Sequence, residues 1–224
     1  MMKRRGVLFV VSAPSGAGKT TLCKELAARV PNLKHSISYT TRSPRPGEVH
    51  GREYFFVDAR YFQSLVERDE FAEWAQVYGQ RYGTPRTPLI EMMDKGVDVL
   101  LEIDVQGARQ IKKTFEDAVY LYILPPSIDA LRVRLQQRGG DSTEEIQRRL
   151  QKVREEMWSY REYDYIVKND EMTQAIMQLE AIVLAERIKT KRVDVQWLEE
   201  NFIRDKELHV RSADDQSDEK ERTR

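Results

Sequence analysis

The chain has 224 residues, of which 40% are hydrophobic and 33% are charged, enough apolar material for one or two compact units with a buried core. This composition excludes a fibre, a mini-protein and a mainly disordered chain. Lysine and arginine total 37 and aspartate and glutamate total 37, so we expect no nucleic-acid or membrane partner, and any site for a charged ligand must be local.

The first apolar run, residues 7–11, is far too short to span a membrane, which takes about 20 residues. Pro14 and a glycine-rich loop follow it in place of a small-residue cleavage site, so it is also a poor signal-peptide core. Cys23 is the single cysteine, which excludes an internal disulfide and a zinc site built from cysteines. We therefore expect a cytoplasmic protein.

The chain opens with a strand, a glycine loop and a helix. Residues 7–12 form a continuous apolar run bounded by Gly6 and Pro14, typical of a strand covered on both faces. Residues 19–30 then carry leucine and valine at helical spacing and stop before Pro31.

Further strands are predicted at residues 97–104 and 119–124, with a helical stretch over 108–115 between them, and a fourth strand at Ile166–Val167. Strands that alternate with helices indicate βαβ units. The fold class is therefore α/β, with a mostly parallel sheet between two layers of helices.

Two insertions interrupt this alternation. Residues 35–90 contain aromatic clusters and four prolines, with helical periodicity only over 61–73, and predict a small α+β subdomain. Residues 127–160 predict two helices joined at Gly139–Gly140, which is the pattern of a movable lid.

An amphipathic helix is expected from about Met172 into Arg187. Beyond it, residues 191–210 carry aromatic and aliphatic side chains at near-helical spacing, and two alternatives stay open: docking on the core, or self-association into a homo-oligomer. Residues 211–224 contain no aliphatic side chain larger than that of Ala213 and are expected to be disordered.

The glycine loop resembles the phosphate-binding pattern G-x-x-x-x-G-K-[ST], with Ala13 in place of the first glycine. Gly16 and Gly18 let backbone N–H groups bend around a triphosphate, and Lys19 would reach its β- and γ-phosphates. Thr20 offers a hydroxyl for Mg²⁺, supported by Asp104 at a strand end. The alternative is a glycine turn with a solvated lysine, but the strand, loop and helix context favours nucleotide binding. The predicted nucleotide-contacting residues are Ala13, Pro14, Ser15, Gly16, Ala17, Gly18, Lys19, Thr20 and Thr21.

Residues 36–57 hold Ser-Tyr-Thr-Thr-Arg-Ser-Pro-Arg-Pro-Gly-Glu (38–48) and Glu-Tyr-Phe-Phe-Val (53–57). Together with Phe71–Ala75, Tyr82–Thr84, Leu101–Gly107, 134–149 and 167–170, they resemble the guanylate kinases, which transfer the γ-phosphoryl group of ATP to GMP. The resemblance covers residues 6 to about 190.

The resemblance implies a P-loop three-layer α/β/α core with an inserted GMP-binding subdomain and a helical lid. The core would comprise residues 1–34, 91–126 and 161–190, the GMP-binding subdomain 35–90, and the lid 127–160.

Arg42 and Arg45 lie three residues apart in a proline-restrained loop, so both guanidinium groups can bind one phosphate. Tyr54 and Tyr82 can donate hydroxyl hydrogens to the same oxygens. Taken singly, these arginines would more often be solvated and these tyrosines packing residues.

Guanine presents N1–H and N2–H₂ on one edge, which one carboxylate can accept together, whereas adenine lacks that pair. The resemblance implies that Glu73 is this acceptor, although Glu73 alone could lie on a surface helix. It also implies roles for further pocket residues: Ser38, Glu48, Thr84 and Asp104.

For the transfer step, the resemblance implies charge stabilisation by Lys19 and by the lid arginines Arg134, Arg138 and Arg149. Glu102 stands where many relatives have aspartate, and it or Asp104 would reach Mg²⁺ through water. Asn169 would contact the donor base. The histidines His35, His50 and His209 fit no triad or metal spacing, and we predict no chemistry for them, while Cys23 is predicted to pack in the core.

These features predict a Mg²⁺-dependent ATP:GMP phosphotransferase of purine nucleotide metabolism that also accepts dGMP. Two alternatives stay open: a catalytically inactive guanylate-kinase-like module that binds phosphopeptides, and a related kinase for another phosphorylated small molecule.

Overall fold

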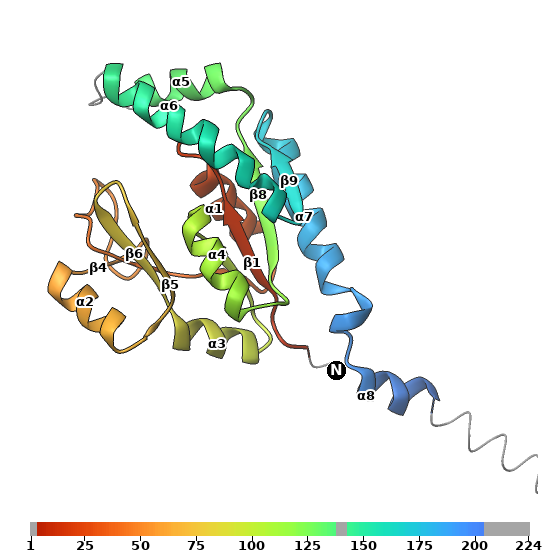
Figure 1. Ribbon diagram of the computed structural model, residues 1–224. Coiled ribbons are helices and arrows are strands. Elements are labelled where there is room, and N and C mark those ends of the chain that lie inside the picture. Colours follow the sequence, from red (N-terminus) through yellow and green to blue (C-terminus); the bar gives the residue numbers. More distant parts are fainter. Residues whose placement is uncertain (1–3, 138–142, 204–224) are drawn as a thin grey trace, which may run out of the picture. The chain divides into compact units, whose positions relative to one another are not determined.

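The computed structural model describes residues 4–137 and 143–203 (Figure 1). Residues 5–186 form one compact unit, and residues 187–203 belong to a second unit that we describe by itself. In the described part of the chain, no helix combines the length and apolar character needed to cross a membrane.

A five-stranded sheet forms the centre of the first unit. Its strand order is β2-β7-β1-β8-β9, and every neighbouring pair is parallel. The strands are β1 (Leu8–Ser12), β2 (Leu33–His35), β7 (Asp98–Glu102), β8 (Val119–Leu124) and β9 (Tyr165–Lys168). The predicted strands are confirmed. The short β2 was not predicted, because three residues are too few to show a strand pattern.

Alternate residues of β1 face opposite layers of helices. Phe9 and Val11 pack in a cluster with residues of α1 (Lys19–Arg29) and α7 (Met172–Arg187). Leu8 and Val10 pack with residues of α3 (Arg86–Asp94) and α4 (Val105–Thr114). These three layers confirm the predicted α/β class. Helix α3 was not predicted; its Pro88 lies in the first turn, where the missing N–H costs no helical hydrogen bond.

A second sheet follows the order β4-β3-β6-β5 and mixes one parallel pair, β3 with β4, with antiparallel pairs. Its strands are β3 (Tyr39–Thr40), β4 (Phe55–Phe56), β5 (Phe71–Val77) and β6 (Gln80–Pro85). Helix α2 (Ala59–Glu67) packs Phe62 and Leu65 against Phe71 of β5.

The helix predicted over 61–73 was wrong beyond Glu67. Asp69 has a positive φ of 53°, which ends helical geometry, and from Phe71 the chain pairs with β6. Glu73 therefore lies on a strand, and the surface-helix interpretation of it is wrong.

Two helices, α5 (Ile128–Gln137) and α6 (Thr143–Met157), pack through Leu131, Leu150 and Val153. They confirm the two helices expected in this insertion, but Gly139–Gly140 lies outside the described residues. A 3₁₀ turn, η1 (Trp158–Glu162), follows α6, and Arg109 of α4 donates to its Glu162 carboxylate at 2.8 Å.

The second unit contains η2 (Thr190–Arg192), α8 (Val195–Leu198) and a π-helical turn, η3 (Glu199–Ile203). Asp194 caps α8 by accepting a hydrogen bond from the Trp197 N–H at 3.1 Å. The alternatives of docking and self-association both stay predictions, and the tail predicted to be disordered, 211–224, lies outside the described residues.

Candidate active site

The glycine loop joins β1 to α1 and curls through two left-handed residues. Gly16 and Gly18 have φ values of 89° and 90°, which glycine adopts without a steric penalty. Ala13 is not among the residues with positive φ, so its backbone does not require the glycine of the strict motif. Asn169, just after the edge strand β9, donates from Nδ2 to the Ala17 carbonyl at 2.7 Å and so ties the loop to the end of that strand.

A cavity of about 240 Å³ lies over this loop. All nine predicted nucleotide-contacting residues from Ala13 to Thr21 line it, joined by Val77, Tyr78, Asp104 and Glu156. Glu156, on helix α6, was not predicted here, and only the fold brings it to this cavity.

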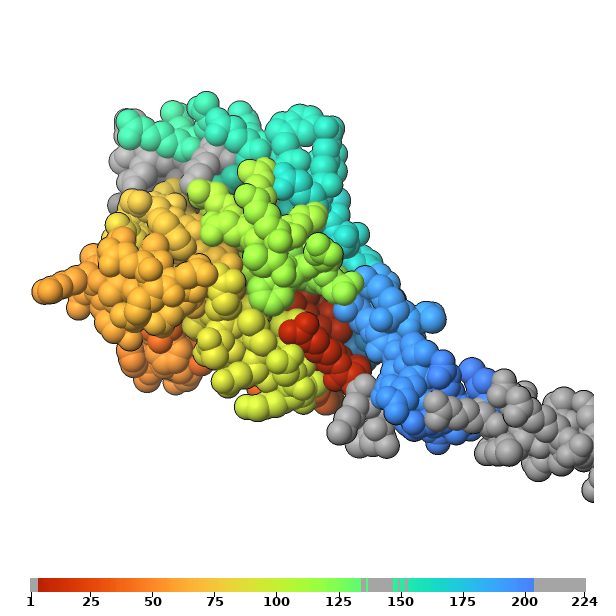
Figure 2. Space-filling model, turned by 60° about the horizontal axis from the view of Figure 1, so that its bottom comes forward, coloured from red at the N-terminus to blue at the C-terminus, as the bar shows by residue number. Residues whose placement is uncertain are grey.

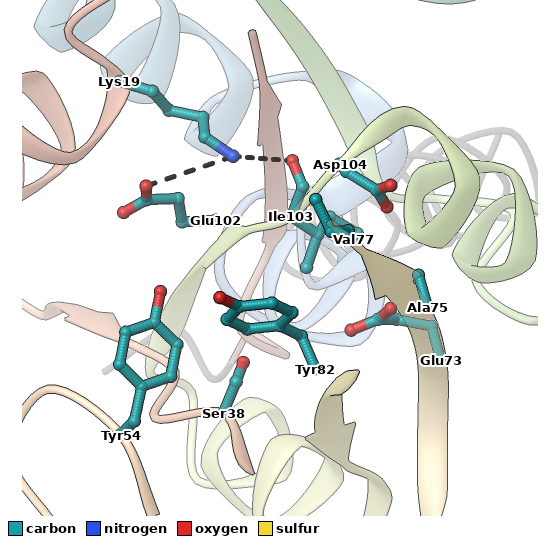
Figure 3. Close-up of a pocket in the computed structure, with 10 residues that line it drawn as sticks. All are labelled: Lys19, Ser38, Tyr54, Glu73, Ala75, Val77, Tyr82, Glu102, Ile103 and Asp104. Atoms are coloured by element: carbon teal, nitrogen blue, oxygen red, sulfur yellow. Dashed lines mark hydrogen bonds and ion pairs between the residues drawn. The ribbon is translucent and has the colours of Figure 1, made fainter. Parts of the chain in front are cut away.

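Lys19 is held between two groups at the end of β7 (Figure 3). Its Nζ donates to the Ile103 carbonyl at 2.7 Å and lies 4.0 Å from Glu102 Oε1. The ammonium group is thus fixed at the mouth of the loop, where a phosphate chain would pass.

Glu102 is the carboxylate nearest to Thr20, whose hydroxyl donates to Glu102 Oε1 at 2.5 Å. Burial alone would raise the pKa of Glu102, but nearby His35, the charge of Lys19 and the Thr20 hydrogen bond together lower that pKa to about 2. His35 Nε2 lies 3.5 Å from Glu102 Oε2, close enough for an ion pair when the ring is protonated. Glu102 is therefore an anion at neutral pH.

Asp104 caps helix α4. Its Oδ1 accepts from the Gly107 N–H at 2.9 Å, and its Oδ2 accepts from Gln106 Nε2 at 3.0 Å. These contacts fix the carboxylate at the boundary between the loop cavity and a second cavity.

The second cavity, of about 180 Å³, continues from the first, because both share Lys19, Val77 and Asp104 (Figure 3). The other lining residues lie on strands of the two sheets or directly beside them: Ser38, Tyr54, Glu73, Ala75, Tyr82, Glu102 and Ile103. The structure thus brings together most of the predicted acceptor residues around one space.

Glu73 is the buried acid of this cavity, with 4% of its surface exposed. Thr84 donates to Glu73 Oε1 at 2.5 Å, and burial, despite this hydrogen bond, raises the pKa of Glu73 to about 7. Thr84 itself is fully buried, so it supports Glu73 from behind and does not line the cavity, while the Ser38 hydroxyl lies 3.4 Å from that of Thr84.

Helix α4 approaches Glu73 closely at Gly107. A Cβ atom on Gly107 would lie 2.4 Å from Glu73 Oε2, so only glycine allows this approach. One turn later, Gln110 Nε2 donates to the Trp74 carbonyl at 2.7 Å and its Oε1 accepts from the Trp74 N–H at 3.2 Å. Figure 2 shows α4 in light green against the second sheet in orange and yellow. Neither role was predicted, because both depend on a contact between distant segments of the chain.

Arg42 is held by Glu48 in a two-pronged ion pair. Its Nη1 and Nη2 donate to Glu48 Oε2 and Oε1 at 2.8 and 3.0 Å, and the guanidinium group stacks over the Tyr54 ring at 5.4 Å. The Arg45 N–H also donates to Glu48, at 2.7 Å. Glu48 therefore organises the arginine loop. Arg42, Arg45 and Glu48 line neither cavity, and Arg45 is exposed.

The lid arginines are incompletely described. Arg134 and Arg149 lie on α5 and α6, but their side chains, and the whole of Arg138, lie outside the described part of the structure. Their predicted role stays a prediction.

Comparison with known proteins identifies the family. A sequence model described as "Guanylate kinase" matches residues 5–186. The chain belongs to the guanylate kinase family. It is 52% identical over 192 residues to guanylate kinases of Geobacter metallireducens and Geobacter sulfurreducens, covering 86% of this chain and 95% of each relative.

A solved structure supports the same assignment. The guanylate kinase of Anaplasma phagocytophilum is 35% identical to this chain, with a TM-score of 0.77, and the match covers 91% of this chain and 98% of that one. The resemblance predicted from the sequence motifs is therefore confirmed. Both cavities are lined by residues inside the matched range of this guanylate kinase family member.

Proposed function

We propose that this chain is a guanylate kinase that transfers the γ-phosphoryl group of ATP to GMP, and to dGMP, giving ADP and the nucleoside diphosphate. Family membership supports the reaction class. The observation that carries the choice of acceptor is Glu73, a buried carboxylate that lines a cavity continuous with a phosphate-binding loop.

Guanine would be recognised at Glu73. Its N1–H and N2–H₂ groups are paired donors, and an ionised carboxylate accepts both, whereas adenine presents an acceptor at N1 and would leave the buried acid unpaired. Donors from guanine stabilise the ionised form, so GMP binding lowers the pKa of Glu73 from its raised value in the free protein.

The acceptor phosphate would be bound by Arg42, with hydroxyl donation from Tyr54 and Tyr82. Glu48 and the Tyr54 ring already hold the Arg42 guanidinium in one orientation, which reduces the entropy lost when the phosphate binds. Arg45, exposed on the same loop, would approach the phosphate from the solvent side.

The donor triphosphate would lie on the glycine loop, with backbone N–H groups at the start of α1 and Lys19 as its cationic partners. Asn169 fixes the loop through Ala17, so its role in this structure is to shape the cradle. Contact of Asn169 with the donor base remains a proposal.

The residues around Thr20 fit a magnesium ion. The Thr20 hydroxyl and the Glu102 carboxylate are adjacent oxygen donors, and Glu102 is ionised; oxygen donors are what Mg²⁺ prefers. Thr20 would be a direct ligand, and Glu102 or Asp104 would act through water. When bound, Mg²⁺ supplies positive charge to the donor phosphate oxygens.

Phosphoryl transfer then needs in-line positioning and positive charge where the transferring group spreads its negative charge. Lys19 supplies one charge, and we propose that Arg134, Arg138 and Arg149 supply the others from the lid. No general base is required, because the attacking GMP phosphate oxygen is already anionic. The single cysteine fits work in a reducing compartment such as the cytoplasm.

An acceptor panel tests this proposal. With ATP and Mg²⁺ in a coupled assay, we expect GMP and dGMP to be phosphorylated and AMP, CMP and UMP to show kcat/KM values at least about 100-fold lower, because each leaves buried polar groups unpaired. Turnover of AMP in preference to GMP would refute the role of Glu73. No turnover of any nucleotide would favour a binding module that has lost catalysis.

A further inference from the structure

Three side chains with different metal-ligand atoms meet behind the glycine loop. Cys23 comes from α1, His35 ends β2 and Glu102 ends β7, and one ligand atom of each lies within 4.8 Å of the other two. Strands β2 and β7 are neighbours in the sheet, so their ends are held together by backbone hydrogen bonds.

The hydrogen bonding of His35 leaves a lone pair aimed into this cluster. His35 Nδ1 lies 3.1 Å from the Ser36 carbonyl oxygen. A carbonyl only accepts, so Nδ1 carries the proton, and in the neutral ring Nε2 is the unprotonated nitrogen. Nε2 is buried without a hydrogen-bond partner and lies 3.5 Å from Glu102 Oε2. A backbone carbonyl on the opposite nitrogen is also the usual support of a metal-binding histidine.

Nε2 and Glu102 Oε2 are both buried hydrogen-bond acceptors, so they require a cation between them. A proton on Nε2 would serve, but it would make no use of the third group, the fully buried Cys23 thiol. A divalent metal ion uses all three, because sulfur, imidazole nitrogen and carboxylate oxygen are together the ligands that Zn²⁺ takes in proteins.

We propose that Cys23, His35 and Glu102 form a binding site for a zinc-class divalent cation, at a second position that shares only Glu102 with the magnesium site. On binding, the Cys23 S–H bond is replaced by a sulfur–metal bond and the proton passes to solvent, so no oxidant or reductant is needed. Ligand atoms around tetrahedral zinc lie roughly 3.5 Å apart, so the three side chains must close by about 1 Å.

The site is joined to the catalytic groups through the two oxygens of Glu102. Oε2 faces His35, whereas Oε1 accepts from Thr20. Oε1 also lies 4.0 Å from Lys19 Nζ (Figure 3). Glu102 also lines the acceptor cavity, which gives an ion a route to the cluster. A zinc ion on Oε2 would neutralise the carboxylate that supports Thr20 and Mg²⁺. Occupation therefore inhibits phosphoryl transfer, a consequence that rests on the proposed function.

Cobalt titration of the untagged full chain tests binding without reference to activity. Because Cys23 is the single cysteine, a sulfur-to-cobalt charge-transfer absorption can arise from that residue alone. We expect this band to appear at one Co²⁺ per chain, to be displaced by Zn²⁺, to vanish in Cys23→Ala, and to need at least about tenfold more Co²⁺ in His35→Gln. His50→Gln, an exposed histidine of the second sheet region, is the matched control and should leave the band unchanged.

Absence of the band in the wild-type chain would overturn the proposal, and this result needs no variant to fold. Equal Zn²⁺ affinity of wild type and Cys23→Ala by calorimetry would overturn it as well.

An activity assay tests the inhibitory consequence. At saturating Mg²⁺ and ATP, we expect Cys23→Ala to tolerate at least about tenfold more Zn²⁺ than the wild type. Equal inhibition of both would show that zinc acts at the magnesium site, and would refute the inhibitory consequence. Failure of the chain to phosphorylate GMP would leave the cobalt result standing.

Discussion

The free-energy cost of burying the Glu73 carboxyl group depends on the groups around it. Thr84 satisfies one oxygen, and Gly107 allows the α4 backbone to approach the other. In the described part of the chain Glu73 forms no ion pair with a lysine or arginine, and burial raises its pKa to about 7. Such raised values are typical of carboxyl groups placed for a ligand and not for stability.

This raised pKa makes the stability of the free protein depend on pH. The unfolded chain has an ordinary glutamate pKa near 4.5, so the folded state binds the proton more tightly, and the stability present below pH 4.5 is lost as the pH rises through about 7. We expect Glu73→Gln, which cannot ionise, to be more stable than the wild type at pH 8 by on the order of 3 kcal/mol, with little difference at pH 4.5.

Urea denaturation at a series of pH values measures this difference. Glu116→Gln removes the same charge from an exposed position of the chain and should track the wild type throughout. A Glu73→Gln stability difference that stays constant from pH 4.5 to 8 would contradict the raised pKa.

Helix α4 links the strand that carries Glu73 to the turn after α6. Gln110 bonds both backbone groups of Trp74, next to Glu73, and Arg109 binds Glu162 of η1. Because β5 is the edge strand of its sheet, Gln110 occupies hydrogen-bonding positions that no further strand fills. The contact sets how close Glu73 lies to the start of α4.

We expect Gln110→Ala to raise the KM for GMP by about tenfold, because two hydrogen bonds of roughly 0.7 kcal/mol each position the strand that carries Glu73. The KM for ATP and kcat should change less than about twofold. Steady-state kinetics measure all three values.

Lys113→Ala changes an exposed residue of the same helix and provides the control, with unchanged kinetics expected. A fall in kcat with an unchanged KM for GMP would show that Gln110 does not position the acceptor site.

Across the whole molecule, every residue assigned to the two cavities lies within residues 13–156, inside the range that the guanylate kinase family model matches. We therefore expect a chain ending at residue 190 to keep kcat and both KM values within about twofold of the full chain.

A chain ending at residue 170 is the contrasting variant, since it lacks α7. Ile176, Leu179 and Val183 of α7 are fully buried in the core, and each contributes about 1.5–3 kcal/mol against a typical total stability of about 5–15 kcal/mol. We expect circular dichroism to show no cooperative unfolding for this shorter chain. If the chain that ends at residue 190 lost its activity, the residues beyond 190 would have a role in catalysis.

Local signals accounted for the glycine loop and the core strands. Residues 13–20 are contiguous, so their roles follow from spacing alone, and β1 and β8 are long apolar runs. The family motifs also pointed to Glu73, but not to its strand, because the helical spacing of α2 continues past the turn at Asp69.

Contacts between distant segments were beyond the reach of the sequence pattern. Gln110 and Gly107 act across about 35 residues of chain, and His35 was assigned no chemistry because its neighbours Cys23 and Glu102 come from other elements. Thr84 donates to Glu73, and its predicted contact with the base stays a prediction.

The most direct test of the account is a crystal structure of the chain with GMP bound. We expect the guanine N1–H and N2–H₂ groups on the Glu73 carboxylate and the phosphate on Arg42, Tyr54 and Tyr82. A nucleotide bound with its phosphate in the Gly16–Thr20 loop and its base away from Glu73 would contradict the proposed acceptor site.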